Sequence, residues 1–113
     1  LMVNSGSSAI MLAIESLNLP QGSEVITPAL TFSTTVSYLN RNNLVPVFLD
    51  VKKNTFCIDE NTVVKAITKK TKAIIAPHLI GNLVNWKKIY KILKKKKIII
   101  IEDSADTLGA TLD

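Results

Sequence analysis

The sequence predicts an α/β fold of three layers, in which helices cover both faces of a mostly parallel sheet. Short apolar segments alternate along the chain with segments whose apolar residues recur at helical spacing. The most pronounced apolar segment, residues 98–101, consists of four isoleucines without polar alternation, which is typical of a strand covered on both faces. Because strands and helices alternate, the helices can form crossovers, and parallel pairing follows.

The size and the cysteine content indicate one domain in a reducing environment. The chain has 113 residues, enough for one small domain, and contains no repeat or linker, so we expect a single domain over residues 1–113. Cys57 is the only cysteine, which excludes an internal disulfide and a cysteine metal cluster. We therefore expect a cytoplasmic protein. No apolar run reaches the roughly 18 residues of a membrane span, so no membrane partner is expected.

The charge is positive, but its pattern does not favour nucleic-acid binding. The formal net charge is +5, and most of the excess lies in short lysine clusters within residues 52–53, 69–72, 87–88 and 94–97. Nucleic-acid interfaces more often use arginine with interleaved aromatic residues, whereas this chain has Arg41 as its only arginine. We interpret the lysines as solvated helix faces and helix ends, and expect no nucleic-acid partner.

In the first half of the chain, turn residues separate two helices and two strands. A helix is predicted from residue 7 or 8 to 17, after the N-cap formers of residues 4–8. A turn at residues 19–22 leads to a strand over 24–27 that Pro28 ends. A second helix is predicted over 32–41, and a second strand over 45–51, with Pro46 near its start, where a missing N–H is tolerated.

The second half continues the alternation with two helices and two strands. Asp59 is predicted to cap a helix over 60–67 that directs Val63, Val64 and Ile67 inward, and a strand follows over 72–77. Asn85 is predicted to cap a helix over 86–95. The expected apolar face of that last helix contains Trp86, Ile89, Tyr90 and Leu93. The isoleucine strand begins at residue 98.

The start of the first helix is a candidate anion site. Gly6, Ser7 and Ser8 begin this helix, where free N–H groups and the helix dipole favour a negative charge. Gly6 allows close approach of a ligand to the backbone, and the serine hydroxyls add donors. The segment lacks the Gly-Lys-Ser/Thr of a phosphate-binding P-loop. Ordinary N-capping is the alternative explanation.

Two further strand ends carry residues suited to a binding site. Phe32 follows the first strand and could lie flat on a planar ligand, although a place in the core is the alternative. His78, the only histidine, follows Pro77 at the end of a strand, and Asn82 lies beyond it in a loop that could fold over a site. A lone histidine is more often structural than catalytic. One histidine and scattered acids do not form a set of metal ligands.

The isoleucine strand ends in Glu102 and Asp103, and carboxylates at this end of a buried strand lie where open α/β sheets bind ligands. We expect Asp103 to face a cofactor, the alternative being that both acids only end the strand. In a parallel sheet Ser7, Phe32, His78 and Asp103 converge on one crevice. A phosphate site, a flat aromatic residue and a buried acid suit pyridoxal phosphate (PLP), whose ring nitrogen a carboxylate keeps protonated.

The chain resembles the DegT/DnrJ/EryC1/StrS family of sugar aminotransferases, which have the aspartate-aminotransferase fold. The matching segments follow the family's order over nearly the whole chain. They are residues 3–9 (VNSGSSA), 24–28 (EVITP) with Thr31 and Phe32, 46–51 (PVFLDV), 71–75 (TKAII), 77–79 (PHL) with Gly81, and 101–105 (IEDSA) with Gly109 and Ala110. Each segment alone is weakly specific, but the ordered series is strongly specific.

The resemblance implies roles for the candidate residues. Ser7 and Ser8 would hold the cofactor phosphate, Phe32 would stack on the ring, and Asp103 would pair with the ring nitrogen. Where the family usually has Gln or His near the ring hydroxyl, this chain has Asp106, whose carboxylate would repel a phenolate oxygen. Together with residues 6–8, 44–48 and 81–82, Asp106 makes the chain resemble instead a subgroup of the family, the nucleotide-sugar 3-dehydrases.

The resemblance also implies a function and a missing residue. It implies a PLP-dependent aminotransferase that acts on a keto nucleotide sugar, with glutamate as donor, in cell-surface polysaccharide or deoxyaminosugar synthesis, and a homodimer. The alternatives are a PLP-dependent nucleotide-sugar 3-dehydrase and a non-catalytic α/β phosphate-binding module. The family's Schiff-base lysine, a histidine in the dehydrases, lies beyond Asp113. We therefore expect the first part of a large domain, without a catalytic residue of its own and inactive when isolated.

Overall fold

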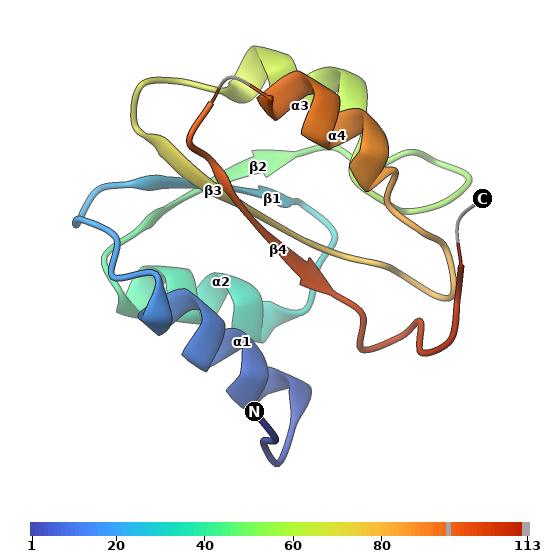
Figure 1. Cartoon of the computed structure of the whole chain (residues 1–113), viewed down its shortest axis with the longest axis horizontal. Coiled ribbons are helices and arrows are strands. Elements are labelled where there is room, and N and C mark those ends of the chain that lie inside the picture. Colours follow the sequence, from blue (N-terminus) through green and yellow to red (C-terminus); the bar gives the residue numbers. More distant parts are fainter. Residues whose placement is uncertain (95, 112–113) are drawn as a thin grey trace.

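A computed structural model of the chain describes residues 1–94 and 96–111, and it confirms the predicted α/β class (Figure 1). All four strands in the described residues pair in parallel, in the order β2-β1-β3-β4. Helices α1 and α2 cover one face of the sheet, and α3 and α4 cover the other (Figure 1). The elements are α1 (Gly6–Ser16), β1 (Glu24–Pro28), α2 (Ser33–Arg41), β2 (Val45–Leu49), α3 (Glu60–Ala66), β3 (Thr71–Pro77), α4 (Trp86–Leu93) and β4 (Ile99–Asp103).

The core consists of two apolar clusters, one on each face of the sheet. Successive side chains of a strand point to opposite faces, so Val25 of β1 belongs to the cluster beneath α1 and α2, and Ile26 to the cluster beneath α3 and α4. In β3, Ile75 joins the first cluster and Ile74 the second. This alternation explains why β1 and β3 have uninterrupted apolar sequences: both of their faces are covered.

The predicted element limits are correct to within a few residues. The side chains of Asp59 and Asn85 cap α3 and α4 as predicted, since each accepts a hydrogen bond from a backbone N–H of the first turn. Pro28 is the last residue of β1 rather than the residue after it. The predicted second strand is too long, because β2 ends at Leu49. Residue 95, the predicted end of the last helix, lies outside the described residues.

Three expectations about burial were wrong. Val64 is 52% exposed and Tyr90 is 61% exposed, because their neighbours Val63 and Ile89 face the sheet and adjacent residues of a helix point about 100° apart. The isoleucine strand β4 lies at an edge of the sheet, next to β3 alone among the described strands. Its residue Ile99 is therefore 42% exposed, and the strand is not covered on both faces along its whole length.

The contrast between Val63 and Val64 gives a matched stability test. Val63 is fully buried on the side of α3 that faces the sheet, so Val63→Ala should lower the free energy of unfolding of the full-length protein by about 1.5–3 kcal/mol. Val64→Ala removes the same atoms from a half-exposed position and should change stability by less than about 0.5 kcal/mol. Thermal or denaturant unfolding of both variants measures the difference. Equal losses would show that α3 does not face the sheet as described.

The strand order places the topological switch point of the sheet between β1 and β3. From β1 the chain moves outward to β2 through α2, which lies on one face. From β3 it moves in the other direction to β4 through α4, which lies on the opposite face (Figure 1). The connections therefore separate at the carboxyl ends of β1 and β3. In open α/β sheets this switch point is where ligands bind.

Candidate cofactor site

A cavity of about 450 Å³ lies at this switch point. Three groups of lining residues follow the carboxyl ends of β1, β3 and β4, and a fourth group begins α1. The volume is within the usual range for small-molecule sites. The lining residues are Ser5, Gly6, Ser7, Ile10, Leu30, Thr31, Phe32, Thr34, Pro77, His78, Leu79, Asp103, Ala105 and Asp106.

The first turn of α1 forms one wall of the cavity. Ser5 is the N-cap, and its side-chain oxygen accepts a hydrogen bond of 3.2 Å from the backbone N–H of Ser8. Gly6 and Ser7 follow it and line the cavity, and the first N–H groups of a helix have no acceptor within the helix. The first turn contains no acidic residue. This end of α1 can therefore bind an anion.

The alternation along β4 separates its two terminal acids. Ile100 packs against the cluster beneath α3 and α4, and Ile101 against the cluster beneath α1 and α2. Two residues further on, Glu102 accordingly lines a second, smaller cavity on the α4 side, whereas Asp103 lines the 450 Å³ cavity beside α1. The structure thus brings Asp103, and not Glu102, to the candidate site.

Asp103 also shapes the chain that follows it. Its Oδ1 accepts a hydrogen bond of 3.1 Å from the backbone N–H of Ala105, so this acid also caps the turn that follows β4. The same turn places Asp106 on the wall of the cavity, which brings a second carboxylate to the site. Phe32 is 66% exposed at the cavity and is not a core residue.

Two of the proposed residues, Ser8 and Asn82, do not line the cavity. Ser8 interacts with Ser5 through its backbone N–H and its hydroxyl group. Asn82 lies in a tight turn, where its Nδ2 donates to the carbonyl oxygen of Leu79 at 3.2 Å. Ser8 can therefore contribute to an anion site only as part of the first turn of α1.

Thr31 and Thr34 also line the cavity, although neither was predicted as a binding residue. Thr34 Oγ1 accepts a hydrogen bond of 3.5 Å from Ser7 Oγ, which links the starts of α1 and α2. Within the described residues, Thr31 Oγ1 is buried without a hydrogen-bond partner. The available signal was their position beside Phe32, directly after a strand.

The residues of the cavity fit a phosphorylated aromatic cofactor. The start of α1 supplies a site for the phosphate, Asp103 a carboxylate for a protonated ring nitrogen, and Phe32 an exposed ring for stacking. The unpaired Thr31 hydroxyl provides a further buried polar group next to this space. Asp106 fits such a cofactor less well, because its carboxylate would be repelled by a phenolate oxygen on the cofactor ring.

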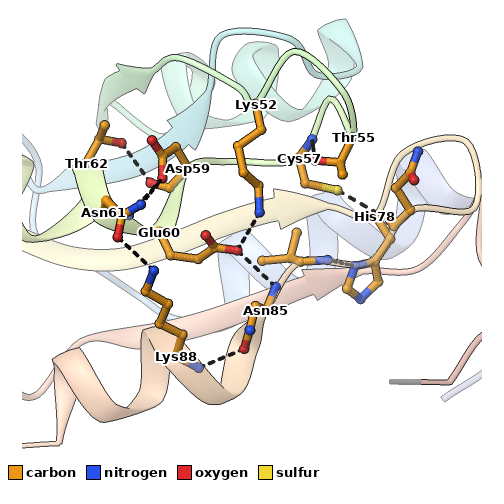
Figure 2. A network of polar contacts seen from close by, with 12 residues as sticks. Lys52, Thr55, Cys57, Asp59, Glu60, Asn61, Thr62, His78, Asn85 and Lys88 are labelled. Carbon is orange, nitrogen blue, oxygen red and sulfur yellow. Dashed lines mark hydrogen bonds and ion pairs between the residues drawn. The ribbon is translucent and has the colours of Figure 1, made fainter. Parts of the chain in front are cut away.

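A polar network connects the loop after β2 with the starts of α3 and α4 (Figure 2). Glu60 is buried, and its Oε1 lies 2.9 Å from Lys52 Nζ and 3.4 Å from the backbone N–H of Asn85. Burial raises the pKa of Glu60, but the hydrogen bond and charge of Lys52, together with backbone hydrogen bonds, outweigh it and hold the pKa below the usual 4.5. The carboxylate of Glu60 therefore joins the start of α3 to the start of α4.

This network predicts a pH-dependent loss of stability. A carboxyl group with a lowered pKa in the folded state stabilises the fold above its ordinary pKa, and this stability is lost as the pH falls through the folded pKa. Lys52→Met leaves the Glu60 carboxylate without its ion-pair partner and should cost about 1.5–3 kcal/mol at neutral pH. The deficit should shrink as the pH falls from 4.5 through the lower pKa that Glu60 has in the folded state.

Thermal unfolding of the full-length protein between neutral pH and acid measures this effect. Lys53→Met is the matched control, because Lys53 is the exposed neighbour of Lys52 and its substitution removes the same charge. It should leave the unfolding temperature nearly unchanged at every pH. A Lys52→Met deficit of the same size in acid as at neutral pH would contradict the assignment to Glu60.

Within residues 1–94 and 96–111, no group of three or more His, Cys, Asp or Glu side chains is placed to hold a metal ion. In the same part of the chain, no helix is long and apolar enough to cross a membrane.

Comparison with known proteins identifies the family. The model of the DegT/DnrJ/EryC1/StrS aminotransferase family matches residues 1–113. The chain belongs to this family. Two curated relatives show the range of reactions in this family. A GDP-4-keto-6-deoxy-D-mannose 3-dehydratase of Yersinia pseudotuberculosis is 42% identical over 99% of this chain and 30% of its own length. A 3-oxo-glucose-6-phosphate:glutamate aminotransferase of Bacillus subtilis is 38% identical over 96% of this chain and 24% of its own.

Solved structures of the family agree with this fold and with its cofactor. The structure of an Escherichia coli GDP-4-keto-6-deoxy-D-mannose-3-dehydratase with bound hydrated PLP matches the whole chain with a TM-score of 0.94 and 39% identity, and the match covers 31% of that protein. The DegT/DnrJ/EryC1/StrS family is PLP-dependent, and the fold is that of fold-type I PLP enzymes. The chain spans less than a third of the length of these relatives.

Proposed function

We propose that this chain is the cofactor-binding first part of a PLP-dependent enzyme that transfers an amino group to a keto nucleotide sugar. One observation carries the proposal: the start of α1 and the carboxylate of Asp103 line the same cavity, at the switch point of the sheet. An anion site and a carboxylate in one crevice match the two ends of PLP. The family supports the assignment, since its members include sugar aminotransferases.

Each residue of the site has a separate task in this proposal. The first turn of α1, with Gly6, Ser7 and Ser8, binds the phosphate. Phe32 stacks on the ring, and Asp103 holds a proton at the ring nitrogen. When bound, the cofactor supplies an electron sink for reactions at a carbon attached to nitrogen. Fixing the proton at the ring nitrogen is what makes that sink effective.

Removal of a hydroxyl from such a sugar is the second candidate. Asp106 favours it, because this residue lines the cavity at a place where the aminotransferases usually have Gln or His. The similarity to 3-dehydratases points in the same direction. Glutamate is the proposed amino donor in both cases. We further propose a cytoplasmic homodimer, in keeping with the family resemblance.

The experiment that tests the proposal uses the full-length protein. Purified protein with PLP and glutamate is incubated with 4-keto nucleotide sugars, and 2-oxoglutarate and the sugar products are measured by mass spectrometry. Amino transfer predicts a nitrogen-containing sugar formed in equal amount with 2-oxoglutarate. Dehydration predicts a sugar that has lost a hydroxyl group and contains no new nitrogen, with one ammonia released for each glutamate oxidised to 2-oxoglutarate. If the protein does not bind PLP, both proposed reactions are ruled out, and a non-catalytic phosphate-binding module is the remaining hypothesis.

A further inference from the structure

His78 connects three segments at the back of the candidate cofactor site. It follows the last residue of β3, and its backbone N–H donates a hydrogen bond of 2.9 Å to the carbonyl oxygen of Asp103. The side chain is only 4% exposed. Its Nδ1 lies 2.8 Å from the backbone nitrogen of Val84, and its Nε2 lies 2.8 Å from Glu102 Oε1. Both ring nitrogens are therefore engaged, one with the loop after β3 and one with β4.

The contact with Val84 determines which nitrogen carries the proton. A backbone N–H can only donate a hydrogen bond, so Nδ1 of His78 must be the acceptor and cannot carry hydrogen. The neutral ring then has its hydrogen on Nε2, which donates to the Glu102 carboxylate. The interaction between His78 and Glu102 is thus a directed hydrogen bond and does not require a positive charge on the ring.

The loop that supplies the Val84 N–H is itself held in place. Glu60 accepts a hydrogen bond from the backbone N–H of Asn85, and Cys57 Sγ lies 3.4 Å from the carbonyl oxygen of Asn82 (Figure 2). Trp86 packs edge-on against the ring of His78, with centroids 6.4 Å apart. The imidazole is consequently held in one position, and the half-exposed Glu102 is hydrogen-bonded to it.

Glu102 in turn precedes Asp103 in the same strand. β4 pairs with β3 alone among the described strands, and Pro77 and Asp103 are the last pair of that ladder. Because adjacent strand residues point to opposite faces, holding Glu102 on the α4 side directs Asp103 toward the cavity beside α1.

We propose that His78 and Glu102 are positioning residues, which hold the end of β4 so that the Asp103 carboxylate faces the cofactor ring. The inference rests on the proposed function, because it concerns the carboxylate assigned there to the ring nitrogen. It adds a role for a buried histidine whose two ring nitrogens are both engaged within the protein. The interaction that holds Glu102 in place is the hydrogen bond from Nε2 of His78, and not an ion pair.

Two substitutions of Glu102 test this, since Glu102 is half exposed and can be changed without emptying the core. The full-length protein is freed of cofactor and titrated with PLP, and the dissociation constant is measured by absorbance. Glu102→Ala removes the acceptor and should weaken PLP binding about five- to tenfold, the value of one hydrogen bond. Glu102→Gln keeps a carbonyl acceptor at the same place and should stay within about twofold of the wild type.

Combining each change with Asp103→Asn separates positioning from a general structural effect. If Glu102 acts through Asp103, Glu102→Ala should have little further effect on PLP binding in the Asp103→Asn background. An undiminished effect there would overturn the proposal, as would a Glu102→Gln protein as weak as Glu102→Ala. Failure of the wild type to bind PLP would instead count against the proposed function itself, so the two failures are distinguishable.

Discussion

Replacing Asp103 with asparagine in the full-length protein should lower kcat at least about a hundredfold while PLP still binds. Asparagine has nearly the same shape, but it cannot hold a proton at the ring nitrogen as a carboxylate does, and preorganised charges of this kind contribute about a hundred- to thousandfold to rate. The position of Asp103 on the cavity wall, beside the start of α1, is the basis of the expectation.

Steady-state kinetics and a PLP titration of the same protein preparation measure the two effects. Glu15→Gln is a suitable control, because Glu15 is exposed on α1 away from the cavity and its change removes the same charge. It should leave kcat unaltered. Full turnover by the Asp103→Asn protein would remove the basis for assigning the ring nitrogen to this residue. A wild-type protein that binds PLP without turnover, and binds it equally well after Asp103→Asn, would favour the phosphate-binding module.

Truncating Ile74 should produce the largest loss of stability among the changes considered. Ile74 is fully buried at the centre of β3, which has a paired strand on each side, and it belongs to the cluster beneath α3 and α4. Ile74→Ala should lower the free energy of unfolding by about 2–5 kcal/mol, because it removes apolar contacts and leaves a cavity in a covered strand.

A graded series provides the control for this prediction. Ile74→Val removes a single methylene group from the same place and should cost about 0.5–1.5 kcal/mol. Denaturant unfolding of the full-length protein, followed by circular dichroism, measures both variants. If Ile74→Ala costs no more than Ile74→Val, the central position of β3 in the fold is incorrect. The expected difference in stability loss between the two variants reflects packing alone, since Ile74 is not among the residues that line the candidate cofactor cavity.

Much of the candidate site could be predicted because it depends on local sequence signals. Strand ends and helix starts have recognisable residue types, so the sequence alone predicts that Ser7, Phe32, His78 and Asp103 each lie at such an end. The family order then connected them. In a parallel sheet, ends of the same kind must lie at the same edge, and the structure places all four on one cavity.

Other features could not be predicted, because they depend on which neighbours an element acquires. Val64 and Tyr90 lie beside residues that face the sheet, and apolar periodicity over only two turns does not determine where the covered face ends. The four isoleucines indicated a strand, but not that β4 would lie at an edge of the described sheet. The turn of Asn82 depends on hydrogen bonds that no sequence pattern specified.

The sequence by itself determined the α/β class, the order of the elements, the family and the residue types at the candidate site, because these follow from local periodicity and ordered motifs. Only the tertiary structure decided that Glu102 lies against His78, and it gives the physical reason why Asp103, which the sequence already favoured, reaches the cavity. The strand order and the packing of Ile100 and Ile101 on opposite faces direct Asp103 to the α1 side and Glu102 to His78. That choice depends on contacts between strands and helices far apart in the chain, which local sequence signals do not encode.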